Sequence, residues 1–128
     1  MLRILIAALS VSVMPLTAAD KPVTWSGWFS DFQCASAHAA AGIFAATNPE
    51  CSKTCIEKKG AAPVFVSEQA KAVFTVKGYP GLIDDLGYHV QVEGSVDEAA
   101  KTIKIAKVTR LGYDGAACSR RRQKTVEK

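Results

Sequence analysis

The chain has 128 residues, of which 48% are hydrophobic, and its formal net charge at pH 7 is +4. That length is enough for one ordinary domain and not for several. The positive excess lies mainly near the C-terminus, in Arg120, Arg121, Arg122 and Lys124. Because these basic residues have no accompanying aromatic pattern, we expect a solvated chain end and do not expect nucleic acid as a partner.

The first 19 residues have the pattern of a secretory signal peptide. Arg3 precedes an apolar run from Ile4 to Val13, and Thr17, Ala18 and Ala19 are small, which predicts cleavage near Ala19. The apolar run is shorter than the ~20 residues that a membrane span needs, and no second run comes after it. The sequence therefore predicts an exported protein without a membrane span, periplasmic or secreted, whose mature chain begins at Asp20.

A first strand is predicted from Val23 to Asp31, where side chains alternate between two faces. Gly27 in its middle indicates a tight bend or a bulge, as in a small coiled sheet. Trp28 falls on the more polar face and has two interpretations. It is either an exposed aromatic that contacts a ligand or, as we favour, a side chain that covers the end of the sheet beneath the next segment.

An alanine-rich segment after this strand predicts a first helix from about Asp31 to Ala46. Ser30 is the predicted N-cap, with Gln33 three residues later completing a capping-box pattern. Gly42 weakens the helix and indicates a kink or close packing.

A second helix has clearer boundaries. Asn48 can cap it, Pro49 suits its first position, and Gly60 comes just after its last turn. Cys51 and Cys55 are then four residues apart on one face of a short helix.

The remaining sequence predicts four more strands, with a short helix around residues 82–86 between the third and fourth strands. Their expected ranges are Pro63–Val66, Ala72–Val76, His89–Glu93 and Thr102–Leu111. The predicted fold is mainly β with a helical insertion (α+β), and a five-stranded Greek-key barrel of OB type has a helix in the same place. The barrel domain is expected at residues 20–112, its insertion at about 31–60 and a basic tail at 113–128.

Two stretches carry a resemblance to known proteins. GYHVQVEGSVDEAAKTIKIAKVTRL resembles the closing hairpin of small exported bacterial OB-fold proteins. SDFQCASAH and CSKTCIEKKGAAPVFV resemble a group of small exported bacterial proteins of unknown function that share an SD-x-x-C…H…C-x-x-x-C segment. The resemblance implies a fold and a compartment but no activity, and Cys118 lies outside the shared pattern.

Four cysteines in an exported chain are expected to be oxidised unless a metal ion holds them. Cys34, Cys51, Cys55 and Cys118 are therefore disulfide candidates, and four cysteines allow three pairings. A bridge from Cys34 to Cys55 or to Cys51 would join the two helices, whereas Cys51 to Cys55 within one helix is disfavoured. The remaining helix cysteine could then pair with Cys118 and hold the tail.

The alternative is a metal site in which Cys34, His38, Cys51 and Cys55 hold Zn²⁺ or Cu(I). His38 comes four residues after Cys34, so each helix would present two ligands on one face. Against this, structural zinc motifs usually have tighter cysteine turns, and an oxidising compartment competes for the thiols. We favour disulfides, with no cofactor.

Signatures of catalysis are missing from the chain. C-x-x-x-C differs from the redox-active C-x-x-C, and neither a nucleophile elbow nor a phosphate-binding glycine loop is present. Asp84, Asp85 and His89 receive no catalytic role. The sequence thus favours a non-enzymatic binding or structural module whose insertion is held by disulfides.

Overall fold

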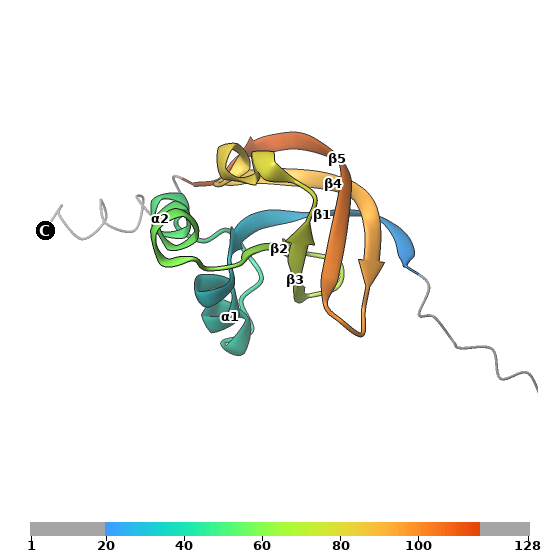
Figure 1. The fold of residues 1–128 in the computed structure, drawn as a ribbon, viewed down its shortest axis with the longest axis horizontal. Coiled ribbons are helices and arrows are strands. Elements are labelled where there is room, and N and C mark those ends of the chain that lie inside the picture. Colours follow the sequence, from blue (N-terminus) through green and yellow to red (C-terminus); the bar gives the residue numbers. More distant parts are fainter. Residues whose placement is uncertain (1–19, 116–128) are drawn as a thin grey trace, which may run out of the picture.

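The computed structural model describes residues 20–115. The predicted signal peptide, Cys118 and the four basic tail residues lie outside the described residues. Within them the protein is mainly β, as predicted, with five strands in one closed sheet and two helices after the first strand (Figure 1). The strands are β1 (Lys21–Asp31), β2 (Pro63–Ser67), β3 (Ala72–Lys77), β4 (Tyr88–Asp97) and β5 (Thr102–Tyr113).

The sheet closes in the order β1-β2-β3-β5-β4, with β4 pairing back onto β1. All neighbouring strands are antiparallel except β3 and β5. β1 closes the sheet by pairing with a strand on each side: its residues 21–28 pair with β4 and its residues 27–31 pair with β2. The end of β1 is therefore held by sheet pairing, which makes it a rigid mount for the helical insertion.

Gly27 lies where β1 changes partner. A Cβ atom at this position would lie 1.9 Å from the backbone oxygen of Val66 on β2. Only a residue without a side chain lets the two backbones approach this closely. This contact explains the glycine that the sequence places in the middle of a strand.

The core fills the inside of the closed sheet. Phe29, Phe65 and Phe74 are at most 2% exposed and lie in one cluster with apolar residues of every strand. The rings of Phe29 and Phe65 meet edge to face at 5.7 Å. Trp25, four residues before Phe29 on the same strand, packs against this cluster, which is consistent with the alternation predicted for β1.

The first helix, α1 (Phe32–Ala40), is shorter than predicted and has a different cap. Its N-cap is Asp31, whose side chain accepts a hydrogen bond from the Cys34 N–H, whereas Ser30 is fully buried and bonds elsewhere. The helix ends before Gly42, which has a φ of +75°. Local alanine propensity therefore did not extend the helix through the glycine to residue 46.

The second helix, α2 (Pro49–Lys59), matches its sequence signals closely. Asn48 caps it through a hydrogen bond from the Cys51 N–H, and Gly60 ends it in the left-handed conformation. Both helices lie at the end of the sheet where β1 finishes, on the left in Figure 1. Between them, α1 and α2 span the connection from β1 to β2.

A short 3-10 helix, η1 (Pro80–Asp85), occupies the predicted place between β3 and β4. Asp85 is 5% exposed and accepts hydrogen bonds from the Tyr79 hydroxyl and from Arg110 Nε, the latter at 2.7 Å. It is thus a buried ion-pair partner that ties η1 to β5, which its sequence position did not reveal. Among residues 20–115, no helix combines the length and apolar character that crossing a membrane requires.

Candidate functional site

Asp31 stands at the junction between the closed sheet and the helical insertion. It is the last residue of β1 and the N-cap of α1, and it is 0% exposed. Its Oδ2 accepts the Cys34 N–H at 3.0 Å, but its Oδ1 is buried with no hydrogen-bond partner among the described residues. An acceptor that has lost water without gaining a donor costs roughly 1–3 kcal/mol.

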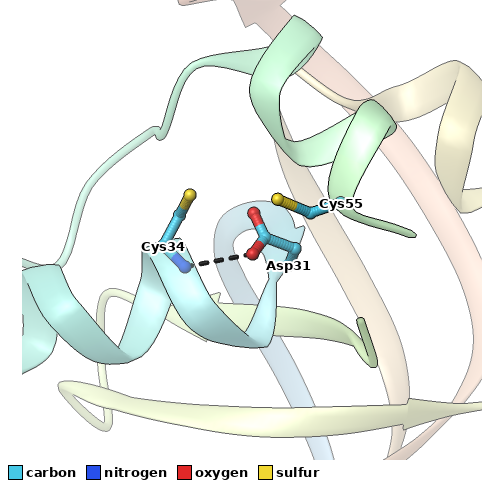
Figure 2. Close-up of side chains that lie close together, drawn as sticks. All are labelled: Asp31, Cys34 and Cys55. Atoms are coloured by element: carbon cyan, nitrogen blue, oxygen red, sulfur yellow. Dashed lines mark hydrogen bonds between the residues drawn. The ribbon is translucent and has the colours of Figure 1, made fainter. Parts of the chain in front are cut away.

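Two thiols converge on this carboxylate from different helices. Cys34 lies in the first turn of α1, and Cys55, which is 9% exposed, lies on the inner face of α2. One ligand atom from each of Asp31, Cys34 and Cys55 lies within 4.8 Å of the other two (Figure 2). Figure 2 shows the carboxylate between the two sulfur atoms, a group that a single cation could bridge.

The pKa values of Cys34 and Asp31 shift as expected for a buried thiol beside a carboxylate. Burial, together with the nearby side chain of Asp31 and its negative charge, raises the pKa of the Cys34 thiol to about 12. Burial also acts to raise the pKa of Asp31, but hydrogen bonds led by the Cys34 N–H outweigh it, and that pKa is lowered. Without a cation, an ionised Asp31 therefore faces a protonated Cys34, which is a poor nucleophile for disulfide exchange.

An open pocket of about 410 Å³ adjoins the group. Cys34, Cys51 and Cys55 line it, together with Glu50, Thr54 and Lys59. Cys51 is exposed and lies one helical turn before Cys55, so its thiol faces the same pocket from the solvent side. The site can therefore be reached from solvent.

The metal set predicted from the sequence is assembled only in part. Cys34 and Cys55 come together, but Cys51 and His38 are not members of the close group. The buried Nδ1 of His38 has no hydrogen-bond partner among the described residues. Asp31 takes their place. The predicted disulfides stay a prediction: Cys34, Cys51 and Cys55 have free thiols in the described chain.

Asp31 was missed because it resembles an ordinary polar residue at the end of a strand. The signal that could have found it is local: a carboxylate three residues before Cys34, at a strand-to-helix junction, must point back toward that turn if it caps the helix. The misplaced cap at Ser30 concealed this signal.

Three buried hydroxyl groups fix α2 against the same end of β1. Ser30 Oγ lies 2.6 Å from Thr47 Oγ1, which lies 3.0 Å from Ser52 Oγ, and all three residues are at most 4% exposed. Ser30 precedes Asp31, and Ser52 lies three residues before Cys55 on α2. The hydroxyl cluster therefore sets the distance between the two elements that carry the site.

Replacing Thr47 by valine keeps the shape and removes the central hydroxyl. We expect the free energy of unfolding to fall by about 1–2 kcal/mol, because Ser30 and Ser52 each lose a buried partner. Urea unfolding monitored by circular dichroism measures this. The exposed Thr54→Val on α2 is the matched control and should change stability by less than about 0.5 kcal/mol.

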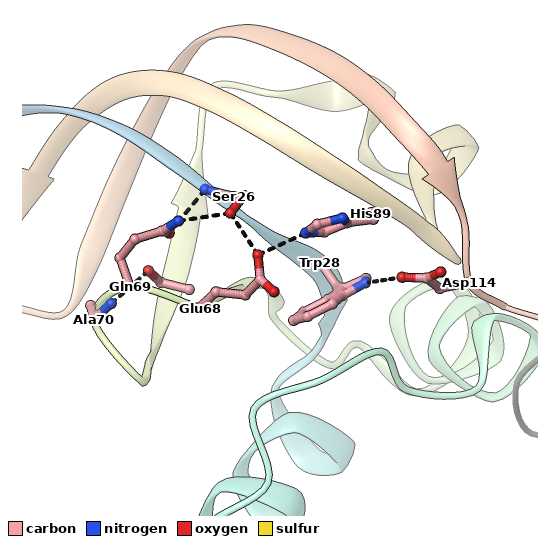
Figure 3. A network of polar contacts seen from close by, with 8 residues as sticks. Ser26, Trp28, Glu68, Gln69, Ala70, His89 and Asp114 are labelled. Atoms are coloured by element: carbon pink, nitrogen blue, oxygen red, sulfur yellow. Dashed lines mark hydrogen bonds and ion pairs between the residues drawn. The ribbon is translucent and has the colours of Figure 1, made fainter.

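A second polar cluster lies on the outside of the sheet, around His89 (Figure 3). His89 Nε2 lies 2.7 Å from Glu68 Oε2, and the Ser26 hydroxyl donates to the same oxygen at 2.6 Å. Because the serine bonds the carboxylate and not the imidazole, the histidine cannot act as its base, so the order of a catalytic triad is absent here. The cluster links β1, the β2–β3 turn and β4.

Trp28 belongs to this cluster and is not the exposed aromatic that the ligand-contact interpretation requires. Its side chain is 9% exposed, its ring stacks on His89 at 4.9 Å, and its Nε1–H donates to Asp114 at 3.0 Å. It therefore packs as part of the protein's own structure, between β4 and the residue after β5.

The Glu68 carboxylate makes stability dependent on pH in acid. The hydrogen bond from Ser26, reinforced by that with His89, lowers its pKa from the usual 4.5. A group with a lowered pKa in the folded state adds stability above pH 4.5 and loses it as the pH falls through the folded-state pKa.

We therefore expect unfolding free energies measured from pH 6 to pH 3 to fall more steeply for the wild type than for Glu68→Gln. The difference should stay below about 1 kcal/mol, because Glu68 and His89 are 37% and 28% exposed and solvent screens them. Parallel curves would show that the contact contributes nothing in solution.

Comparison with known proteins adds no assignment, since no family model, curated protein or solved structure matches this chain.

Proposed function

We propose that this chain is an exported, non-enzymatic module of OB type that binds a thiophilic divalent cation, first of all Zn²⁺, through Asp31, Cys34 and Cys55. The observation that carries the proposal is the buried, unpartnered Oδ1 of Asp31 beside two converging thiols. A cation would satisfy that oxygen and supply the positive charge that the group lacks.

The donor set favours zinc over Cu(I). Two sulfur atoms and a carboxylate oxygen are all accepted zinc ligands, whereas Cu(I) prefers soft ligands alone. Binding would displace the thiol protons, so affinity should rise with pH. The pocket beside the group leaves room for a fourth ligand, either water or a group supplied from outside.

The OB assignment rests on the connectivity of the sheet. The strand order β1-β2-β3-β5-β4, the parallel β3–β5 pair and the helix η1 between β3 and β4 are the features that support it. The candidate site then lies at the β1–β2 connection, outside the sheet. Export rests on residues 1–19 of the sequence alone.

The second candidate is the structural module in which a Cys34–Cys55 disulfide joins α1 to α2. The observation in its favour is the same convergence, with the two sulfurs within 4.8 Å. Such a bridge would contribute about 3 kcal/mol for a loop of this size. It would also remove both thiols beside Asp31 and leave the buried Oδ1 without a donor, which is why we rank it second.

Zinc titration of the reduced mature protein against a chromophoric zinc chelator tests the proposal. One zinc ion should bind, and Cys34→Ser or Cys55→Ser should each lower the affinity by roughly 100-fold or more. His38→Ala and Cys51→Ser should retain nearly full affinity, because neither side chain is in the close group. Equal losses in all four variants, or no zinc uptake by the wild type, would refute the assigned ligand set.

A further inference from the structure

A third thiol stands at the mouth of the candidate zinc site. Cys51 is exposed and lines the pocket of about 410 Å³ that also reaches Cys34 and Cys55. It is not a member of the close group, so in the described conformation its sulfur does not hold an ion together with all three of the other ligand atoms. The site therefore has beside it a soft donor that the bound state does not use.

The three assigned ligands are difficult for a solvated ion to reach. Asp31 is 0% exposed, Cys55 is 9% exposed, and Cys34 is partly buried. A zinc ion that arrives with water or with another chelator must lose most of those ligands before it binds here, and this desolvation raises the barrier to entry. A thiol on the solvent side binds the ion while it still keeps some of its original ligands, because zinc accepts a fifth ligand in passing.

The spacing of Cys51 and Cys55 suits a direct transfer between them. They are four residues apart on α2, with Cys51 toward solvent and Cys55 toward the close group. Side chains with this spacing have Cβ atoms about 5–6 Å apart. Since a Zn–S bond is about 2.3 Å long, one ion can contact both sulfur atoms during its passage without movement of the helix.

The buried carboxylate of Asp31 gives the transfer its inward direction. Its Oδ1 has no hydrogen-bond partner among the described residues, and Asp31 is more buried than either cysteine of the close group. An ion that reaches the group satisfies this acceptor, whereas an ion on Cys51 alone leaves it unsatisfied. Cys51 is therefore a point of passage, and the close group is where the ion stays.

We propose that Cys51 is the entry and exit ligand of the zinc site, through which this chain exchanges zinc with external thiolate or chelator ligands by direct transfer. This role rests on the proposed function and extends it from a zinc-binding module to a zinc carrier. A structural zinc site is closed, whereas a site with an open pocket and a spare thiol at its mouth allows the ion to leave again.

Each step of the transfer balances. On loading, a bond from zinc to Cys51 forms as a bond to the external ligand breaks, and the Cys51 thiol releases its proton to solvent. As the ion passes to Asp31, Cys34 and Cys55, the bond to Cys51 breaks and that sulfur regains a proton, while the two inner thiols release theirs. Zinc has no redox chemistry, so no oxidant or reductant takes part.

Stopped-flow transfer of zinc between the reduced mature protein and a chromophoric chelator, followed in both directions, tests the proposal. In Cys51→Ser we expect the loading and unloading rates each to fall about 10-fold or more, because a hydroxyl does not replace a thiolate as a zinc ligand. Their ratio, and hence the affinity, should be unchanged, because a ligand used only in passing lowers the barrier without stabilising the bound state.

The matched control is Glu50→Gln, which removes a negative charge from the same pocket without removing a thiol. Its effect on the loading rate should be only a few-fold and should disappear at high salt, because a charge on the pocket wall acts on the arriving ion over a distance. The effect of Cys51→Ser should persist at high salt, since it removes a bond to the ion.

The inference and the proposed function fail by different results. Unchanged transfer rates in Cys51→Ser would overturn the entry role and leave the zinc site intact. A lower affinity with an unchanged loading rate would also overturn it, because Cys51 would then be a ligand of the bound ion. A wild type that takes up no zinc from the chelator would refute the proposed function, and the entry role with it.

Discussion

Replacing Gly27 by alanine is expected to lower the free energy of unfolding by about 3 kcal/mol or more. The added Cβ would lie 1.9 Å from the Val66 carbonyl oxygen and 2.9 Å from a ring carbon of Phe65. The first neighbour is backbone and cannot turn away, so β1 and β2 must separate where β1 changes partner. Because domains of this size have only about 5–15 kcal/mol of stability, much of the population should unfold on mild heating.

Thermal and urea unfolding of Gly27→Ala, monitored by circular dichroism, measure this loss. The control is Gly112→Ala on β5, where an added Cβ meets nothing within 4 Å and the strand conformation accepts alanine. That variant should stay within about 0.5 kcal/mol of the wild type. Equal stability of the two variants would show that β1 and β2 do not approach each other as described.

Replacing Asp31 by asparagine should lower zinc affinity by at least roughly 100-fold, since loss of even an outer-shell partner costs up to that factor. Asparagine keeps a side-chain oxygen that can accept the Cys34 N–H, and it is as good an N-cap as aspartate. The variant therefore removes the charged ligand while retaining the helix cap. The metal-free protein should lose a modest part of its stability, because the lowered pKa of Asp31 means that folding favours the ionised carboxylate that asparagine lacks.

Zinc titration of the Asp31→Asn variant measures the role of Asp31 as a zinc ligand. Urea unfolding of the same preparation without metal measures its role as the cap of α1. Glu50→Gln is the matched control, because it removes one negative charge from the same pocket without touching the close group. It should change zinc affinity only a few-fold. Equal losses in both variants would mean that the pocket attracts zinc by general charge and not through Asp31.

Local signals in the sequence were sufficient for much of the fold. Asn48, Pro49 and Gly60 each act on their own turn of backbone, and α2 has the boundaries that they predict. The β2–β3 hairpin and η1 were likewise predictable from alternation and turn residues. The five strands and their mainly β character arise from the same short-range patterns.

The site depended on contacts between distant segments, and there the sequence was insufficient. Spacing grouped Cys34 with His38 and Cys51 with Cys55, but the chain assembles one cysteine from each helix around Asp31. Which residue of a pair turns inward depends on how α2 packs, and the buried hydroxyls of Ser30, Thr47 and Ser52 take part in that packing together with Ile56, which contacts the core. No local pattern contains this information.

The most direct test of the central claim is the intact mass of the mature protein from periplasmic expression, first under native and then under denaturing, non-reducing conditions. We expect a native mass that includes one zinc ion and a denatured mass less than four hydrogen atoms below the fully reduced value, because Cys34 and Cys55 become free thiols when the ion is lost. A native mass without metal, together with a denatured mass four hydrogen atoms below that value, would contradict the account, because all four cysteines, Cys34 and Cys55 among them, would then be oxidised.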